Sequence, residues 1–371
     1  MALTGFEKTR ITDLTARAFK IPTDKPEADG TFAWTSTTLI VVHVTAGGKT
    51  GIGYTYTDDS IISLTTGKLK QALIDAEADA MDPPAAWFTM QGAVRNMGRP
   101  GLTATAISAV DGALWDLKAK LLDLPLCLLL GRYRDCCHVY GSGGFTTYTD
   151  RQLREQLAGW AKRDGCRCVK MKIGTDPEKD PERVAAAKDA IGDCTLFVDA
   201  NGAYKAKQAL ALAHIFAECA QVGWFEEPVS SDDLEGLQMM RERAPAVMEI
   251  AAGEYGYTVG YFRRMLNAKA VDVIQADITR CGGVTAWLQV AALAHAHHID
   301  LSGHCAPSYH LHAACAAPHF RHLEWFHDHV RVEHMLFDGA PQVKNGIITP
   351  DLSRPGMGLE LKEPDAQKFA L

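Results

Sequence analysis

The 371-residue sequence has no excess of positive charge and no long apolar run. Lysine and arginine total 38 against 45 aspartates and glutamates, which gives a formal charge of −7. Because such a chain has no basic excess to attract phosphates or anionic lipid, we expect no nucleic acid and no membrane as a partner. No window approaches the roughly 18 consecutive apolar residues of a membrane span. Residues 1–8 carry charges where a secretion signal needs an apolar core, so the expected location is cytoplasmic.

Cysteine is sparse and irregularly spaced. The ten cysteines are scattered, and the close pairs, Cys136–Cys137 and Cys166–Cys168, match no structural zinc spacing. We therefore expect mostly buried free thiols in a reducing compartment. The histidines crowd at 295–298 and 310–334, also without a zinc spacing, so a second metal site built on histidine is disfavoured.

The first 125 residues mix strand and helix signals. Thr37–Thr45 is rich in β-branched residues, residues 46–49 form a turn, and Gly51–Thr57 is typical of the return strand. Apolar residues then recur at helical spacing between Ile107 and Leu121. Residues 1–125 are therefore predicted to form an α+β capping domain.

From residue 139 onward the pattern repeats. Short apolar runs begin near residues 139, 168, 195, 222, 249, 271, 299 and 322, with helical segments between them. Eight alternating β and α units predict a (β/α)8 TIM-type barrel over residues 126–340, although periodicity alone leaves a doubly wound open sheet as an alternative. Residues 341–371 are expected to return to the capping domain and complete it, without extending the barrel.

Acidic residues end three consecutive predicted strands. Asp199, Glu226 and Glu254 each follow a strongly apolar run. A single acid at such a place would more simply be a helix cap. Three of them meet in one small volume, because neighbouring strands lie about 4.8 Å apart, and they then need a countercharge. Oxygen ligands of this kind predict a hard divalent cation, most simply Mg²⁺.

Basic groups are predicted to flank that volume. Period-two alternation puts Lys170 and Lys172 on one side of their strand, and the barrel mouth costs less than the apolar outer face. A solvated surface strand is the alternative for these two lysines. Asp277 and His304 end neighbouring strands, so the carboxylate can orient the imidazole, although a lone histidine there is more often structural. Glu324 ends the last strand.

Together these residues resemble the enolase superfamily, specifically its mandelate racemase branch. The resemblance covers nearly the whole chain. The matching elements are Lys170-x-Lys172, Asp199-x-Asn201, Glu226-Glu227-Pro228, Gly253-Glu254, Asp277 five residues before Gly282-Gly283, His304 and Glu324.

The resemblance implies a role for each site residue. Mg²⁺ would bind to the three acids, Lys172 would be the base on one face, and the His304–Asp277 dyad would act on the other. Lys170 would neutralise the substrate carboxylate. The remaining implied contacts are a hydrogen bond from Glu324 to that carboxylate and one from Asn201 to the α-hydroxyl.

The resemblance also bears on specificity and assembly. In the muconate-cycloisomerising branch a lysine takes the place of Asp277, which argues against cycloisomerase chemistry. Loops around 22–34 and 54–62 would cap the site and select the substrate. A homo-oligomer is expected by analogy alone.

The implied chemistry is removal of the proton α to a carboxylate through an enediolate, which the metal and Lys170 would stabilise. A suitable base has a pKa near 7, which lysine reaches only when neighbouring cations lower it. The first hypothesis is dehydration of a sugar acid, an aldonate or aldarate, to a 2-keto-3-deoxy acid. The alternatives are a racemase or epimerase of a 2-hydroxy acid, and a non-catalytic sugar-acid binding protein.

Overall fold

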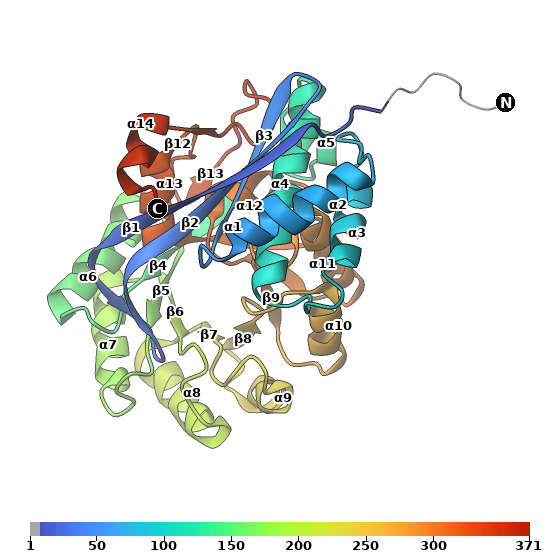
Figure 1. The fold of residues 1–371 in the computed structure, drawn as a ribbon. Helices are drawn as coiled ribbons and strands as arrows, with labels where there is room; N and C mark the ends of the chain where they lie inside the picture. Colours follow the sequence, from blue (N-terminus) through green and yellow to red (C-terminus); the bar gives the residue numbers. More distant parts are fainter. Residues whose placement is uncertain (1–7) are drawn as a thin grey trace.

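Eight parallel strands form a closed barrel in the computed structural model, which describes residues 8–371 (Figure 1). Each strand pairs with the next, and β11 pairs with β4 to close the ring. The open sheet is therefore excluded, and the predicted barrel is confirmed. The barrel strands are β4 (Cys137–Gly143), β5 (Cys168–Lys172), β6 (Thr195–Asp199), β7 (Trp224–Glu226), β8 (Glu249–Ala252), β9 (Val273–Ala276), β10 (Asp300–Gly303) and β11 (Phe320–Phe326).

Helices follow the barrel strands and cover the outside of the ring. The first, α6, begins with a capping box in which Thr149 and Gln152 bond each other's backbone N–H groups. These helices are α6 (Asp150–Ala158), continued by the π-helical turn η2 (Gly159–Arg163), α7 (Asp180–Ile191), α8 (Ala206–Ala220), α9 (Leu234–Arg243), α10 (Val259–Asn267), α11 (Gly283–Ala296), α12 (Pro307–Cys315) and α13 (His327–Leu336).

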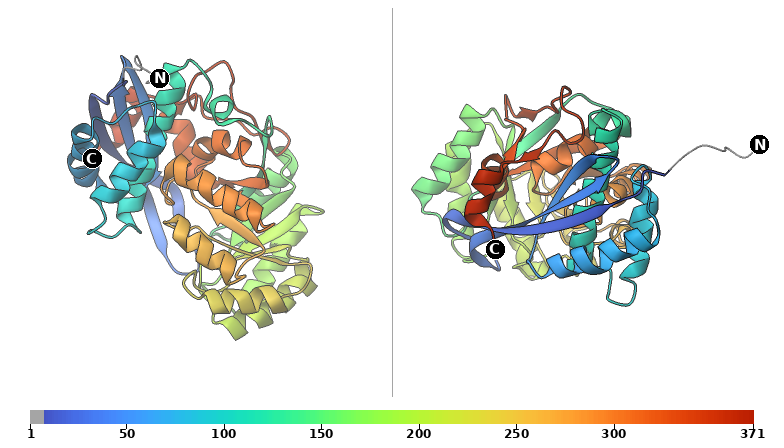
Figure 2. Two further views of the ribbon diagram at one scale, coloured as in Figure 1. Left: turned by 90° about the vertical axis from the view of Figure 1, so that its right-hand side faces the viewer. Right: turned by 45° about the horizontal axis from the view of Figure 1, so that its top comes forward.

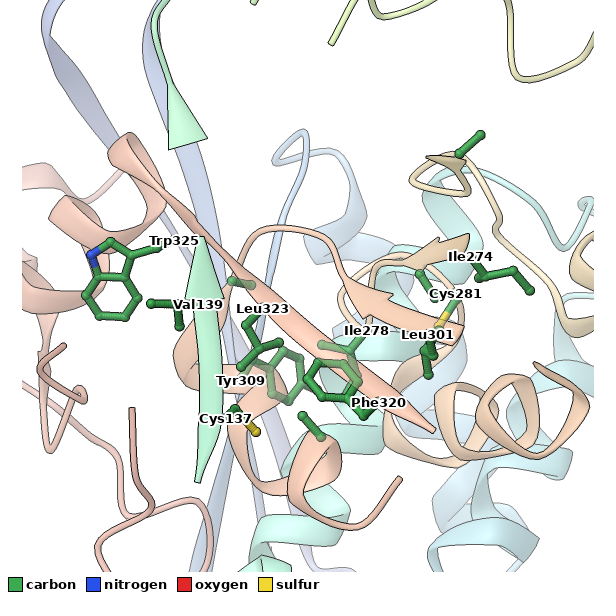
Figure 3. Close-up of a cluster of buried hydrophobic side chains, with 14 of the residues drawn as sticks. Cys137, Val139, Ile274, Ile278, Cys281, Leu301, Tyr309, Phe320, Leu323 and Trp325 are labelled. Atoms are coloured by element: carbon green, nitrogen blue, oxygen red, sulfur yellow. The ribbon is translucent and has the colours of Figure 1, made fainter. Parts of the chain in front are cut away.

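Two sets of apolar side chains hold the barrel together. The larger fills the space between strands and helices; Figure 3 shows Val139 and Leu323 on adjacent strands with Tyr309 of α12. The smaller lies inside the ring, where Phe197 and Trp224 stack with ring centroids 5.0 Å apart. The interior is thus a packed floor and not a pore.

The N-terminal part forms a cap of three antiparallel strands and several helices (Figure 2). The predicted turn and return strand are present, and α4 packs along β3. Gly51 requires its lack of a side chain, because a Cβ there would lie 2.0 Å from the carbonyl oxygen of Ala113 on α4. The elements are β1 (Asp13–Ala28), β2 (Ala33–Ala46), β3 (Lys49–Tyr56), α1 (Ile61–Ser63), the π-helix η1 (Leu64–Leu69), α2 (Lys70–Asp75), α3 (Pro83–Ala93), α4 (Leu102–Leu121) and α5 (Leu126–Leu130).

The β1–β2 hairpin extends from this cap across the barrel, and its tip is attached to barrel loops (Figure 1). Thr146 donates its backbone N–H to the carbonyl of Ala28 at 2.9 Å, and the Thr175 hydroxyl donates to that of Asp29 at 2.8 Å. Gly30 lies so close to the barrel that a Cβ would be 2.6 Å from the carbonyl oxygens of both Ala200 and Ile173. The hairpin tip is therefore a fixed wall of the barrel's mouth.

The C-terminal segment lies against the cap, but it also contributes to the barrel sheet. The backbone N–H of Leu371 donates to the carbonyl of Ala18 on β1 at 3.0 Å. Within this segment, β13 pairs antiparallel with the first two residues of β4, outside the closed ring of eight parallel strands. Cys137 and His138 precede the register that β4 shares with β11, so their backbone groups are free to pair. The segment contains β12 (Phe337–Asp338), β13 (Ile347–Ile348), β14 (Glu360–Leu361), α14 (Glu363–Ala366) and the 3-10 turn η3 (Gln367–Phe369).

Other sequence expectations can be compared with residues 8–371. All ten cysteines are free, and six of them are buried. None of the helices in this range has both the length and the apolar character to cross a membrane. Residues 1–7, most of the stretch considered for a secretion signal, lie outside the described residues. The domain limits at residues 125 and 340 stay a proposal.

Candidate active site

Strand register brings the predicted acids and lysines together at the carboxyl end of the barrel. Lys172 pairs with Asp199 across β5 and β6, and Asp199 pairs with Glu226 across β6 and β7. Glu254 follows the end of β8 by two residues. One carboxylate oxygen from each of the three acids lies within 4.8 Å of the others, and all three side chains are buried. The sequence-predicted cluster is therefore present.

The charges in this cluster do not balance. Lys170 lies 2.7 Å from both Glu226 and Glu324, and Lys172 lies 2.6 Å from Asp199. Four buried carboxylates thus face two ammonium groups, and the nearby Arg280 is shared between Glu254 and a fifth carboxylate, Asp277. Burial, and next the negative charge of Asp199, raise the pKa of Glu226 well above its usual range. Oxygen donors with two excess negative charges fit a divalent cation.

Glu254 also indicates a cation, because its Oε2 is buried without a hydrogen-bond partner and lies 3.3 Å from Nε2 of His304. The other oxygen, Oε1, lies 3.4 Å from Nη1 of Arg280. A buried carboxylate oxygen without a donor is costly unless a cation takes the place of water. The residues present therefore fit a Mg²⁺ site.

Lys172 does not have the lowered pKa that a neutral base at neutral pH requires. Burial acts to lower the pKa of this ammonium, but the combined negative charges of Asp199, Glu254 and Glu226 outweigh it and hold the pKa above its usual value. The positive charge of Lys170 opposes this effect without overcoming it. In the protein alone, then, the surrounding carboxylates, with Asp199 the largest contributor among them, favour the protonated form of Lys172.

His304 and Asp277 form the predicted dyad. Nδ1 of His304 lies 2.8 Å from Oδ2 of Asp277, whose other oxygen accepts bonds from the backbone N–H and hydroxyl of Thr279, both at 2.7 Å. Burial acts to raise the pKa of Asp277, but the hydrogen bond with His304 and the nearby positive charges, Arg280 among them, together outweigh it and keep the pKa well below the usual range. An ionised Asp277 holds the proton on Nδ1 and leaves Nε2 for chemistry.

Lys170 and Glu324 lie below the cavity and are satisfied by the protein. The Lys170 side chain is fully buried, and Glu324 accepts bonds from the Ser142 hydroxyl at 2.6 Å and the Cys305 backbone at 2.9 Å. The predicted contacts of Lys170 and Glu324 with a substrate carboxylate stay predictions.

A cavity of about 300 Å³ opens above the cluster. Lys172, Asn201, Glu254 and His304 all line it, and Asn201 accepts a hydrogen bond from Lys172 at 3.1 Å. The cavity thus places the two candidate proton-transfer groups, from β5 and from the end of β10, around one space. Its other lining residues are Asp29, Phe32, Trp34, Ser36, Thr37, Tyr255, Arg280, Cys305, Phe326 and His329.

Only one of the two predicted specificity loops reaches this cavity. The hairpin tip within residues 22–34 supplies Asp29, Phe32 and Trp34. Residues 54–62 supply none, and that expectation is wrong. The Tyr54 and Tyr56 hydroxyls instead bond Glu333, and Tyr56 stacks on His329 with ring centroids 3.5 Å apart. This second segment therefore supports the wall and does not form it.

Some site residues escaped sequence reasoning. Arg280 lies between Glu254 and Asp277, and the only signal for it was its position between Asp277 and Gly282-Gly283. Cys305 lies with its Sγ 3.3 Å from Nε2 of His304. Both Asn201 and Cys305 have φ in the left-handed region, at 45° and 51°, a strain that concentrates at functional sites.

Comparisons with known families agree with this geometry. Residues 14–131 match the mandelate racemase / muconate lactonizing enzyme N-terminal domain, and residues 152–366 match the enolase C-terminal domain-like family. A mandelate racemase/muconate lactonizing enzyme-like protein from Rubrobacter xylanophilus superimposes with a TM-score of 0.95 at 52% identity, covering 98% of this chain and 100% of that one. A racemase from Streptomyces coelicolor with bound magnesium gives 0.90 at 30% identity, covering 97% and 100%.

Two characterised relatives carry different activities. The 3,6-anhydro-alpha-L-galactonate cycloisomerase of Streptomyces coelicolor is 33% identical over 87% of this chain and 89% of its own length. The L-talarate/galactarate dehydratase of Salmonella typhimurium is 32% identical over 72% and 66%. One of these relatives is thus a cycloisomerase and the other a dehydratase. The chain belongs to the mandelate racemase / muconate lactonizing enzyme family of the enolase superfamily, and its relatives there are enzymes.

Proposed function

We propose that this enzyme removes the proton α to a substrate carboxylate, with Mg²⁺ held by Asp199, Glu226 and Glu254, and dehydrates a sugar acid to a 2-keto-3-deoxy acid. The observation that carries the proposal is the single cavity lined by Lys172, Glu254 and His304. In this cavity, Glu254, one of the three acids expected to bind Mg²⁺, and the two groups expected to transfer protons surround the space for one small ligand. The dehydratase relative supports the choice of reaction.

The metal would supply charge. When bound, Mg²⁺ neutralises the negative charge that develops on the substrate carboxylate as the α-proton leaves and the enediolate forms. The chain's own part is to hold three carboxylates within 4.8 Å of one another and to keep them buried. Lys170 fixes two of them, since its ammonium also lies 3.3 Å from Asp199.

His304 and Lys172 would divide the proton transfers. The α-proton passes to one of these groups and leaves the enediolate, and the β-carbon–oxygen bond of that intermediate then breaks. The departing hydroxyl takes a proton from Nε2 of His304 and leaves as water, and the resulting enol becomes the 2-keto acid. Asp277 fixes the imidazole through the 2.8 Å contact at Nδ1. For Lys172 to act as the base, the pull of Asp199 on its proton has to be relieved.

Racemisation or epimerisation of a 2-hydroxy acid is the alternative that the geometry also favours. Lys172 and His304 reach the same cavity from different strands, so one can remove a proton and the other return it on the opposite face. The racemase neighbour and the cycloisomerase relative keep reactions without loss of water open.

A sugar-acid library decides between these reactions. The Mg²⁺-loaded protein is incubated with each acid in D₂O, and the products are followed by 2-keto acid release, mass and α-deuterium content. Dehydration gives a keto acid lighter by one water, whereas racemisation gives α-deuterium at an otherwise unchanged mass. Chelation of the metal should abolish the reaction, and Lys172→Ala and His304→Asn should each lower kcat by about 10²–10⁴. An absence of both turnover and exchange throughout a broad library would contradict the proposal.

For the ligand, the oligomeric state and other partners, we infer only broad classes. Solved relatives bind small carboxylates, one of them L-glucarate and another mandelic acid, and we infer a small carboxylate substrate here. A homo-oligomer, with no nucleic acid or membrane partner, stays a prediction that sedimentation of the purified chain with and without DNA or anionic vesicles would test.

A further inference from the structure

We propose that the substrate is a monocarboxylic sugar acid of the aldonate type, and that the β1–β2 hairpin selects it by excluding a second carboxylate at the far end. This inference rests on the proposed function, because it names the substrate class of that same cavity. It depends on what the hairpin wall presents and on which cavity cations are already paired.

The hairpin wall is aromatic. Phe32 and Trp34 stack with an interplanar angle of 13°, and Trp34 packs edge-on against Phe145 with centroids 5.6 Å apart. The Trp34 indole N–H is not available to a ligand, because it donates to the buried Glu27 at 2.9 Å. Phe32 is 67% exposed although it lines the cavity. Such rings favour the C–H faces of a neutral sugar chain over a carboxylate, which loses its hydration there.

The charged group on this wall is an acid. Asp29 lines the cavity, and one of its oxygens accepts bonds from the backbone N–H groups of Thr31 at 2.6 Å and Phe32 at 2.8 Å. Because the hairpin tip is bonded to the barrel through Thr146 and Thr175, Asp29 is held in place. A terminal carboxylate on the ligand would meet a like charge, whereas a terminal hydroxyl could donate to it.

The cations that line the cavity are already matched by carboxylates. Lys172 bonds Asp199, and Arg280 lies 3.4 Å from both Glu254 and Asp277. His329 is no substitute, because burial lowers its pKa to about 3 and it is neutral at ordinary pH. Among the lining residues, all within 8–371, no other lysine or arginine is present to pair a second carboxylate. A monoacid therefore fits the charge balance, and a diacid does not.

Matched pairs of ligands test the inference directly. Aldonates and aldarates of the same configuration, such as D-gluconate with D-glucarate and D-galactonate with galactarate, differ only at the far carbon. We expect kcat/KM for the better aldonate to exceed that of its aldarate at least ten-fold. Ser36→Arg, which adds a cation at a lining position of β2, should reduce or reverse this ratio. Thr35→Arg is the control, because Thr35 is exposed and does not line the cavity.

Binding separates this inference from the proposed reaction. Calorimetric titration of the same pairs into the Mg²⁺-loaded Lys172→Ala variant measures affinity without turnover, and Asp29→Asn in that background should strengthen aldarate binding selectively. If the variant bound aldonates preferentially while the wild type turned over neither acid, the inference would be supported and the proposed function refuted. Equal or tighter binding of aldarates, or no binding of either acid at millimolar concentration, would overturn the inference.

Discussion

The barrel end and the β1–β2 hairpin border the same cavity, but they line it with different kinds of side chain. At the barrel end, charged side chains such as Lys172 and Asp277 are buried and bonded to one another. On the hairpin, aromatic side chains are partly exposed, and backbone contacts near Gly30 hold them in place. Groups that move protons need fixed partners, whereas a surface that selects ligands needs shape and access. We infer that chemistry belongs to the first region and substrate choice to the second.

Substitutions on the two sides should separate chemistry from binding. Lys172→Ala or His304→Asn should lower kcat by about 10²–10⁴, the usual range for loss of a general acid or base. Phe32→Ala should mainly raise KM, because the exposed ring contacts the ligand equally in the ground and transition states. Steady-state kinetics on the best library substrate measures both effects. A large fall in kcat for Phe32→Ala would contradict the proposed division between chemistry at the barrel end and substrate choice at the hairpin.

A side chain at the hairpin's contact with the barrel should displace the wall. Gly30→Ala puts a Cβ against two backbone carbonyl oxygens, so we expect a loss of about 1–3 kcal/mol in unfolding free energy, together with a raised KM. Urea unfolding and kinetics check the two effects. Gly92→Ala is the control: it has open space within α3 and should be neutral or stabilising. If both variants behaved alike, the hairpin contact would be unimportant.

Because of Glu27, the free energy of unfolding should fall as the pH rises through the neutral range. Burial, and next the charge of Asp328, raise the pKa of this carboxyl to about 9. Between its unfolded pKa of 4.5 and that value, the folded protein keeps a proton that the unfolded chain has lost, so stability falls as pH rises.

Its replacement should remove that dependence. Glu27→Gln should gain on the order of 2 kcal/mol over the wild type between about pH 6 and 8. Unfolding curves at both pH values measure it, with the exposed Glu178→Gln as the control. A wild type whose stability is flat across this interval would contradict the assignment.

The smallest effect is expected for a single attachment of the hairpin tip. Thr175→Val removes the hydroxyl that donates to the Asp29 carbonyl, at a cost of about 0.5–1 kcal/mol because the bond is exposed. Thermal unfolding detects this loss, and KM should rise slightly. Thr89→Val, which removes a hydroxyl bond to Ala85 within α3, should cost a similar amount without changing KM. If KM changed in both variants, the change could not be attributed to the contact between the hairpin tip and the barrel.

The residues at the carboxyl end of the barrel could be predicted from the sequence, because the end of each strand is marked by the residues immediately around it. Asp199 and Glu226 follow apolar runs at regular intervals, and parallel strands must bring their carboxyl ends to one edge. The hairpin was not readable in this way. Nothing in the residues near Asp29 and Trp34 indicates that they cross the barrel, while Tyr54 and Tyr56, predicted at the same surface, turn inward to Glu333.

The sequence alone determined the order of the β/α units and the identity of the ionisable groups at their ends, because both follow from residue type and periodicity along the chain. The tertiary structure decided which of those groups face the cavity, how Asp199 and the other carboxylates hold the proton on Lys172, and which aromatic residues line the mouth. These depend on distances between segments far apart in the chain. Electrostatic interactions and packing act over such distances, whatever the spacing in sequence.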